Sequence, residues 1–125
     1  MAKIIIATRN SKKLSEIEVF MKDSKLEFCS QLDFDLKSCD EPFGTFVENA
    51  LAKARYASKN TGLPAIADDS GICVDILKGK PGIYSARFSG KSATDEKNIK
   101  KLLKVLNGEI NRKAHFHCSI VFIRN

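Results

Sequence analysis

The chain has 125 residues, 43% of them hydrophobic, and a formal net charge of +6 at pH 7. This length suits a single domain with a real core, and no apolar run is long enough to cross a membrane. The four cysteines form no C-x-x-C pair, which argues against zinc-ribbon or thioredoxin chemistry and predicts reduced thiols in a cytoplasmic protein.

The positive charge favours a polyanionic partner, either a nucleotide or a nucleic acid. Many of the lysines fall on one predicted helix around Lys97–Lys104, where solvation alone explains them. The sequence has no arginine-rich block, and aromatic residues do not interleave with the basic ones. A nucleotide is therefore the preferred partner, and neither a nucleic acid nor a membrane is expected.

The first predicted element is a buried central strand at Lys3–Thr8, because the run Ile4-Ile5-Ile6 is short, continuous and β-branched. A polar loop, Thr8–Lys13, follows and leads into a helix that Asn10 or Ser11 can cap. Free backbone N–H groups at such a helix start can bind an anion. An ordinary strand-to-helix connection with surface lysines explains the same pattern, so both interpretations stay open at this point.

Leu26–Gln31 predicts a second strand, and the long acidic segment Leu32–Gly44 predicts a loop. Glu41 in this loop is a candidate for a cation site, although most acidic loop residues are simply solvated. Thr45 and Glu48 have the spacing of a capping box. They predict a helix that extends to about Thr61.

Ala65–Gly71 is a short apolar run that gives way to Asp68, Asp69 and Ser70. Two adjacent carboxylates repel each other and resist burial, and a divalent cation is the simplest partner that would relieve both effects. A turn or a helix cap also uses these residue types. Gly71 is expected to let the chain turn sharply after the acids.

Three short predicted segments follow. Ile72–Leu77 predicts a strand, and Lys78–Gly82 predicts a turn from its glycines and proline. Ile83–Phe88 fits either a strand edge or a short helix.

The clearest helix begins after Thr94 and ends at Asn107-Gly108. The alternating stretch Ala114–Ile123 predicts a long strand. His115 and His117 share one face of that strand, and a solvent-facing or edge position is the preferred interpretation over a zinc site. A long terminal strand of this kind leaves an open edge, which suggests further sequence downstream.

Four motifs in order resemble the inosine/xanthosine triphosphate pyrophosphatase family. The first resembles the family's A-T-x-N-x-x-K-x-x-E, and the second its F-x-E-N-A-x-x-K-A helix. The other two resemble A-D-D-S-G and P-G-x-Y-S-A-R. In this chain they are Ala7–Glu16, Phe46–Ala54, Ala67–Gly71 and Pro81–Arg87.

The resemblance implies an α/β fold with a mixed β-sheet flanked by helices, residues 1–125 forming the N-terminal portion of a longer family domain. It implies a magnesium-dependent hydrolase, usually a homodimer, that converts non-standard purine nucleoside triphosphates (ITP, dITP, XTP) to monophosphate and pyrophosphate. Charge neutralisation by lysines and Mg²⁺, with a positioned water, suits that reaction.

The same resemblance assigns roles to individual residues. Asp69 would be the catalytic base, and Glu41, Asp68 and Asp69 would form the metal site. The substrate-binding residues would be Thr8, Arg9, Asn10, Ser11, Lys12, Lys13, Lys53 and Ser70.

The chain departs from the family in one respect. The family's later motifs F-G-Y-D-P and S-H-R, which recognise the purine base, do not occur in this sequence. Three alternatives therefore remain: a truncated, inactive fragment that binds nucleotide phosphates, the related septum-inhibition nucleotide pyrophosphatase family, and a nucleic-acid-binding module. The A-D-D-S-G and E-N-A-x-x-K-A strings argue against the second.

Overall fold

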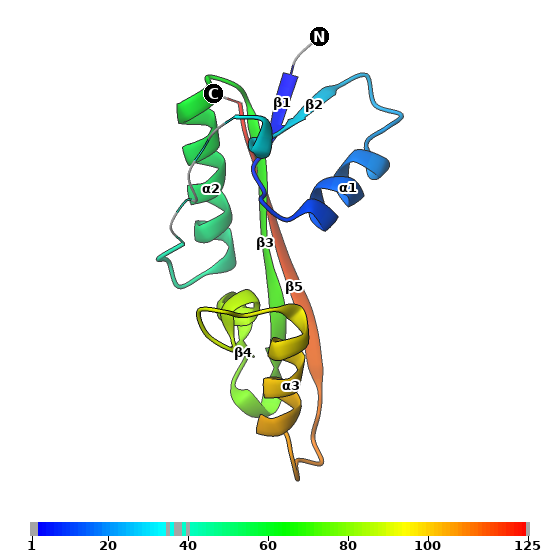
Figure 1. Ribbon diagram of the computed structural model, residues 1–125, viewed down its shortest axis with the longest axis vertical. Coiled ribbons are helices and arrows are strands. Elements are labelled where there is room, and N and C mark those ends of the chain that lie inside the picture. Colours follow the sequence, from blue (N-terminus) through cyan, green and yellow to red (C-terminus); the bar gives the residue numbers. More distant parts are fainter. Residues whose placement is uncertain (1–2, 35, 37–38, 40, 125) are drawn as a thin grey trace. The chain divides into compact units, whose positions relative to one another are not determined.

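A computed structural model describes residues 3–34, 36, 39 and 41–124 (Figure 1). The chain divides into two compact units, Met1–Asp69 with Ser119–Asn125, and Ser70–Cys118. Among the described residues, no helix has the length and apolar character needed to cross a membrane. The prediction of a single domain stays a prediction.

The first unit is built on parallel strands. β1 (Lys3–Ile6) pairs on one side with β2 (Glu27–Ser30) and on the other with β3 (Ala65–Val74). Ile5 faces Cys29 of β2 and Ala65 of β3 in this register. The predicted buried central strand is confirmed, because its three isoleucines are all buried.

Two helices of this unit begin at the caps that local rules predict, and the second also ends at its predicted glycine. α1 (Ser11–Phe20) is capped by Asn10, and α2 (Phe46–Thr61) lies between the Thr45 cap and Gly62, which adopts φ +72°. The Thr45 hydroxyl accepts from Glu48 N–H at 3.2 Å, as a capping box requires. The same hydroxyl donates to Glu48 Oε1 at 2.7 Å.

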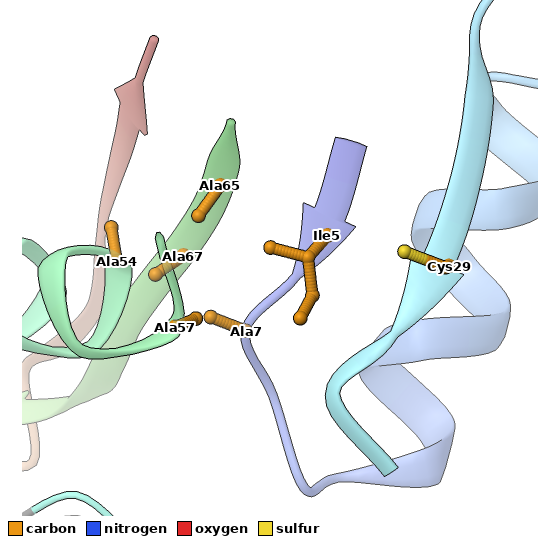
Figure 2. Packing of buried hydrophobic residues seen from close by; sticks show 7 residues of the cluster. All are labelled: Ile5, Ala7, Cys29, Ala54, Ala57, Ala65 and Ala67. Carbon is orange, nitrogen blue, oxygen red and sulfur yellow. The ribbon is translucent and has the colours of Figure 1, made fainter. Parts of the chain in front are cut away.

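Small side chains allow α2 to lie close to the sheet. Figure 2 shows the buried cluster, in which α2 alanines approach alanines from β3 and from the end of β1. Its members are Ile5, Ala7, Cys29, Ala54, Ala57, Ala65 and Ala67. Because the helix packs through methyl groups, its backbone and its polar residues come close to the end of β1 and to β3. This brings α2 close to the candidate site.

The structure contradicts the expected end of the strand at the acids. β3 is one continuous ten-residue strand that includes Asp68, Asp69 and Gly71. Along it, burial alternates from Ala65 onward, so that Asp69 is buried and Asp68 is only partly buried. Strand side chains alternate between faces, and the two carboxylates therefore point in opposite directions. They do not form the shared pair that their adjacency suggested.

Gly71 has a different role from the sharp turn that the sequence suggested. A Cβ built on Gly71 would collide with the carbonyl oxygen of Gly82 and lie 2.6 Å from Ser85 Oγ. Ser85 Oγ also accepts from Ile72 N–H at 2.9 Å and donates to Gly82 O at 2.6 Å. The glycine is needed for a close approach of backbone segments.

Gly71→Ala should therefore destabilise the protein. We expect a loss of about 1–3 kcal/mol in the free energy of unfolding, because the obstructing Gly82 atom is backbone and cannot rotate away. Gly44→Ala is the matched control, since nothing lies within 4 Å of a Cβ at Gly44. Chemical denaturation of both variants checks this, and equal stabilities would contradict the packing explanation.

The second unit begins at Ser70, within β3, and ends at Cys118. β3 pairs there with the short antiparallel β4 (Lys80–Pro81), which follows a 3₁₀ turn at Asp75–Leu77. The predicted strand Ile72–Leu77 therefore ends at Val74, because the chain turns at Asp75. Gly82–Arg87 is a 3₁₀ helix, in agreement with the short-helix alternative.

The helix after Thr94 and the long last strand are both confirmed, as α3 (Asp95–Val105) and β5 (Ala114–Ile123), and β5 pairs with β3. His115 and His117 are exposed, as the preferred interpretation expected.

Candidate functional site

The Thr8–Lys13 loop owes its shape to two of its own side chains. Thr8 is buried, and its hydroxyl accepts from Asn10 N–H at 3.1 Å. Asn10 Oδ1 then accepts from the backbone N–H groups of Lys12 and Lys13, at 3.0 and 3.3 Å. The loop is thus an ordered helix start with exposed Arg9, Ser11 and Lys12.

Lys13 connects this loop to β3. Its Nζ lies 2.9 Å from Asp68 Oδ2, with the lysine 30% and the aspartate 13% exposed. Asp68 therefore already has a positively charged partner within the protein. Ser70 is two residues further along β3 and shares the Asp68 face by alternation.

Asp69 lies on the opposite face of β3 and is only 8% exposed. Its Oδ2 atom is buried and has no hydrogen-bond partner among the described residues. Burial raises the pKa of Asp69 above its ordinary value, and the Glu41 carboxylate raises it further. The charges of Lys53 and Lys13 lower the pKa, but they do not cancel the rise.

Glu41 and Lys53 bring the acidic loop against α2. Lys53 Nζ lies 3.2 Å from Glu41 Oε1, and both side chains are mostly buried. The predicted role of Glu41 beside Asp69 is consistent with this placement, since the two carboxylates are close enough to affect each other electrostatically. The structure thus brings together residues that are separated in the sequence by 12 to 28 positions.

Sequence reasoning missed Asn49. This α2 residue is 1% exposed and exchanges two hydrogen bonds with the Phe43 backbone. It also lies near enough to Asp69 to lower the pKa of that carboxyl. The available signal was its place in the E-N-A-x-x-K-A string, one helical turn before Lys53. An asparagine inside a helix is a poor helix former, which also marks it for a specific contact.

The donor set suits a hard divalent cation. Glu41, Asp68 and Asp69 carry three negative charges against the two positive charges of Lys13 and Lys53, which leaves one negative charge in excess. Among the described residues, no three His, Cys, Asp or Glu side chains are grouped closely enough to enclose a metal. Mg²⁺ needs only one or two carboxylates, because waters and phosphates complete its coordination. The unpartnered Asp69 oxygen beside Glu41 meets that need.

Comparison with known proteins places the chain in a family. The sequence model of the Ham1 family matches residues 4–125. The chain belongs to the Ham1 family. This confirms the expected family, and the similar structures of the family confirm the expected mixed sheet flanked by helices. The septum-inhibition nucleotide pyrophosphatase family is therefore no longer an alternative.

Relatives in the Ham1 family include a dITP/XTP pyrophosphatase of Nitrosomonas europaea, 50% identical over 125 residues, and one of Escherichia coli K12, 48% identical over 127 residues. The chain is covered completely in both comparisons but spans only 62% and 64% of these relatives.

The structures of related proteins are similar to that of this chain. A HAM1 protein from Coxiella burnetii superposes with a TM-score of 0.91 at 43% identity, over 100% of this chain and 64% of that one. A dITP/XTP pyrophosphatase from Mycobacterium abscessus gives 0.81 at 38% identity, over 98% of this chain and 65% of that one.

Proposed function

We propose that this chain carries the phosphate- and magnesium-binding part of a hydrolase that splits non-standard purine nucleoside triphosphates (ITP, dITP, XTP) into monophosphate and pyrophosphate. The observation that carries the proposal is the buried, unpartnered Asp69 oxygen beside Glu41, with Lys13 and Lys53 close by. The names of the relatives supply the substrate class.

The lysines and the Thr8–Lys13 loop would hold the triphosphate. Lys13 and Lys53 would exchange their carboxylate partners, Asp68 and Glu41, for phosphate oxygens when the substrate enters. Backbone N–H groups at the start of α1 favour negative charge for the same electrostatic reason. Arg9, Ser11 and Lys12 would complete this loop surface, and Ser70 would contact the substrate from β3.

Asp69 would act as the base. Its raised pKa makes the carboxylate a better proton acceptor, and it would take a proton from the water that attacks the triphosphate. Glu41 and Asp69, with Asp68 close by, would hold Mg²⁺, which would neutralise charge on the phosphates when bound. The products are the monophosphate and pyrophosphate, with the water oxygen added at the broken phosphoanhydride bond.

A second candidate function is nucleotide-phosphate binding without turnover. It is favoured by the site itself, in which Lys13, Lys53 and the Thr8–Lys13 loop are all groups suited to phosphates. A homodimer and a cytoplasmic location remain proposals for the whole enzyme. β5 exposes Phe116, Ile120 and Phe122, large apolar side chains that a second chain could cover.

Purified residues 1–125 test both candidates. We expect poor or undetectable pyrophosphate release from ITP, XTP and GTP, and Mg²⁺-dependent binding of all three with similar affinity, because only phosphate-directed groups are encoded. Calorimetry measures the binding, a pyrophosphate assay the turnover, and sedimentation the oligomeric state. Efficient turnover with strong purine discrimination by a monomer would establish base recognition within these residues. No binding of any triphosphate would overturn the proposed function.

A further inference from the structure

Asn49 is a polar side chain in the interior for which the proposed reaction has so far given no role. It is 1% exposed, yet it lies in α2, where the neighbouring buried residues are alanines. Burying an amide without partners costs free energy, so its contacts indicate its role.

The contacts of Asn49 fix the orientation of its amide. Phe43 N–H donates to Asn49 Oδ1 at 3.1 Å, and Asn49 Nδ2 donates to Phe43 O at 3.3 Å. Nδ2 is also the only Asn49 atom able to donate to the Asp69 carboxylate, whose pKa Asn49 lowers, because a carboxylate can only accept. If the amide were rotated by half a turn, its oxygen would face the Phe43 carbonyl and the carboxylate. One orientation therefore satisfies all three contacts.

These contacts link the two candidate metal ligands. Phe43 is two residues after Glu41, and Lys53, one helical turn after Asn49, pairs with the Glu41 side chain at 3.2 Å. The same face of α2 thus holds the segment Glu41–Phe43 at two points and Asp69 at a third.

We propose that Asn49 is a positioning residue that fixes the Glu41 segment and the Asp69 carboxylate relative to each other, ready for a divalent cation. This inference rests on the proposed function for the identity of the cation. Mg²⁺ demands near-ideal geometry and accepts few protein ligands, so a prearranged pair of carboxylates raises affinity by reducing the cost of ordering them. Residues that orient metal ligands typically change metal affinity tenfold to a hundredfold when removed, which makes about tenfold the smallest effect expected here.

A double-mutant cycle tests the link between Asn49 and Asp69 without any metal. The variants are Asn49→Ala, Asp69→Ala and the double substitution in the 125-residue chain, unfolded by denaturant in EDTA. We expect a coupling of about tenfold in the unfolding equilibrium constant, because either single variant removes the interaction between Asn49 and the buried Asp69 carboxylate. If Asn49→Ala does not fold, Asn49→Ser replaces it, since a shorter hydroxyl cannot reach Phe43 and Asp69 together. Additive effects would overturn the proposal whether or not the protein binds Mg²⁺.

The second measurement is Mg²⁺ affinity, obtained from the rise in melting temperature with Mg²⁺ concentration. Asn49→Ala should weaken this affinity at least about tenfold. Thr45→Ala is the matched control, because it destabilises the start of α2 by removing its cap and touches neither carboxylate. Asn60→Ala is a second control, which removes the exposed hydrogen bond that Asn60 Nδ2 donates to Tyr56 O on the same helix.

The outcomes separate the two claims. An equal loss of Mg²⁺ affinity in Thr45→Ala would mean that Asn49 acts only through helix stability, and would overturn the positioning role. Unchanged Mg²⁺ affinity in Asn49→Ala would overturn it as well. If the wild-type chain shows no response to Mg²⁺, the cation in the proposed function is wrong, and the cycle in EDTA still decides whether Asn49 fixes Asp69.

Discussion

Asp69→Asn should make the metal-free protein more stable at neutral pH and abolish its response to Mg²⁺. Asp69 is buried, Glu41 lies near it, and Oδ2 has no partner among the described residues. Asparagine keeps the shape and removes the charge, so the cost of burying a carboxylate disappears. A gain of about 1 kcal/mol from removing the buried charge would correspond to a rise of at least about 2 °C in melting temperature.

The pH dependence of this gain follows from the direction of the pKa shift. The pKa of Asp69 is raised in the folded state, so the folded protein holds its proton more tightly than the unfolded chain does. The aspartate therefore destabilises the fold increasingly as pH rises above the ordinary carboxyl value of 3.8 toward the raised pKa. Below that ordinary value both states are protonated, and the advantage of asparagine over aspartate should vanish.

Magnesium should reverse the ranking of the two proteins. A cation that binds only the folded wild type stabilises it by about 2.7 kcal/mol at a concentration one hundred times its dissociation constant. Asp69→Asn should gain nothing, and in a full-length relative the same change should abolish pyrophosphate release without unfolding the protein.

Asp68→Asn is the contrasting control for Asp69→Asn. It removes the 2.9 Å pair with Lys13 and should lower the stability of the metal-free protein instead of raising it. Thermal melts in EDTA and in Mg²⁺ between pH 3 and pH 8 distinguish the variants. A destabilised Asp69→Asn at neutral pH, or one that still responds to Mg²⁺, would contradict the assignment of Asp69.

Lys13→Met and Lys53→Met should each weaken triphosphate binding more than about tenfold, by similar factors for ITP and GTP. A charge-assisted hydrogen bond to phosphate is worth about 1.5–3 kcal/mol, and methionine keeps the length of the side chain without the charge. The loss of affinity should be similar for ITP and GTP, because the two nucleotides differ only in the base. Both ammonium groups lie beside carboxylates of the candidate phosphate and metal site. Titration calorimetry with both nucleotides measures the two ratios.

Two comparisons sharpen this experiment. Lys100→Met removes an exposed lysine that pairs with Glu96 at 3.6 Å, and it should leave binding unchanged. Both site variants should also keep the Mg²⁺ response that Asp69→Asn loses, since they remove cations and leave the carboxylates. A change in base preference caused by Lys13→Met would mean that the loop contacts the base.

The sequence by itself was sufficient for features that depend on neighbouring residues. Asn10 and Thr45 were recognisable as caps, and Gly62 as the end of α2, because each acts on backbone groups within one helical turn. The isoleucine run of β1 was recognisable as a buried strand for a similar local reason. The four motifs likewise identified the family, because strings of this length in order are specific.

Only the tertiary structure decided which charged residues lie next to each other. In the sequence Asp68 and Asp69 are a pair, but a continuous β3 sends them to opposite faces, one toward Lys13 and the other toward Glu41. The local sequence does not predict that β3 continues through these residues, because aspartates and a glycine favour turns. Pairing with neighbouring strands outweighs that preference. The role of Asn49 was hidden for the same reason: its partners, Phe43 and Asp69, reach it only when the loop and β3 fold against α2.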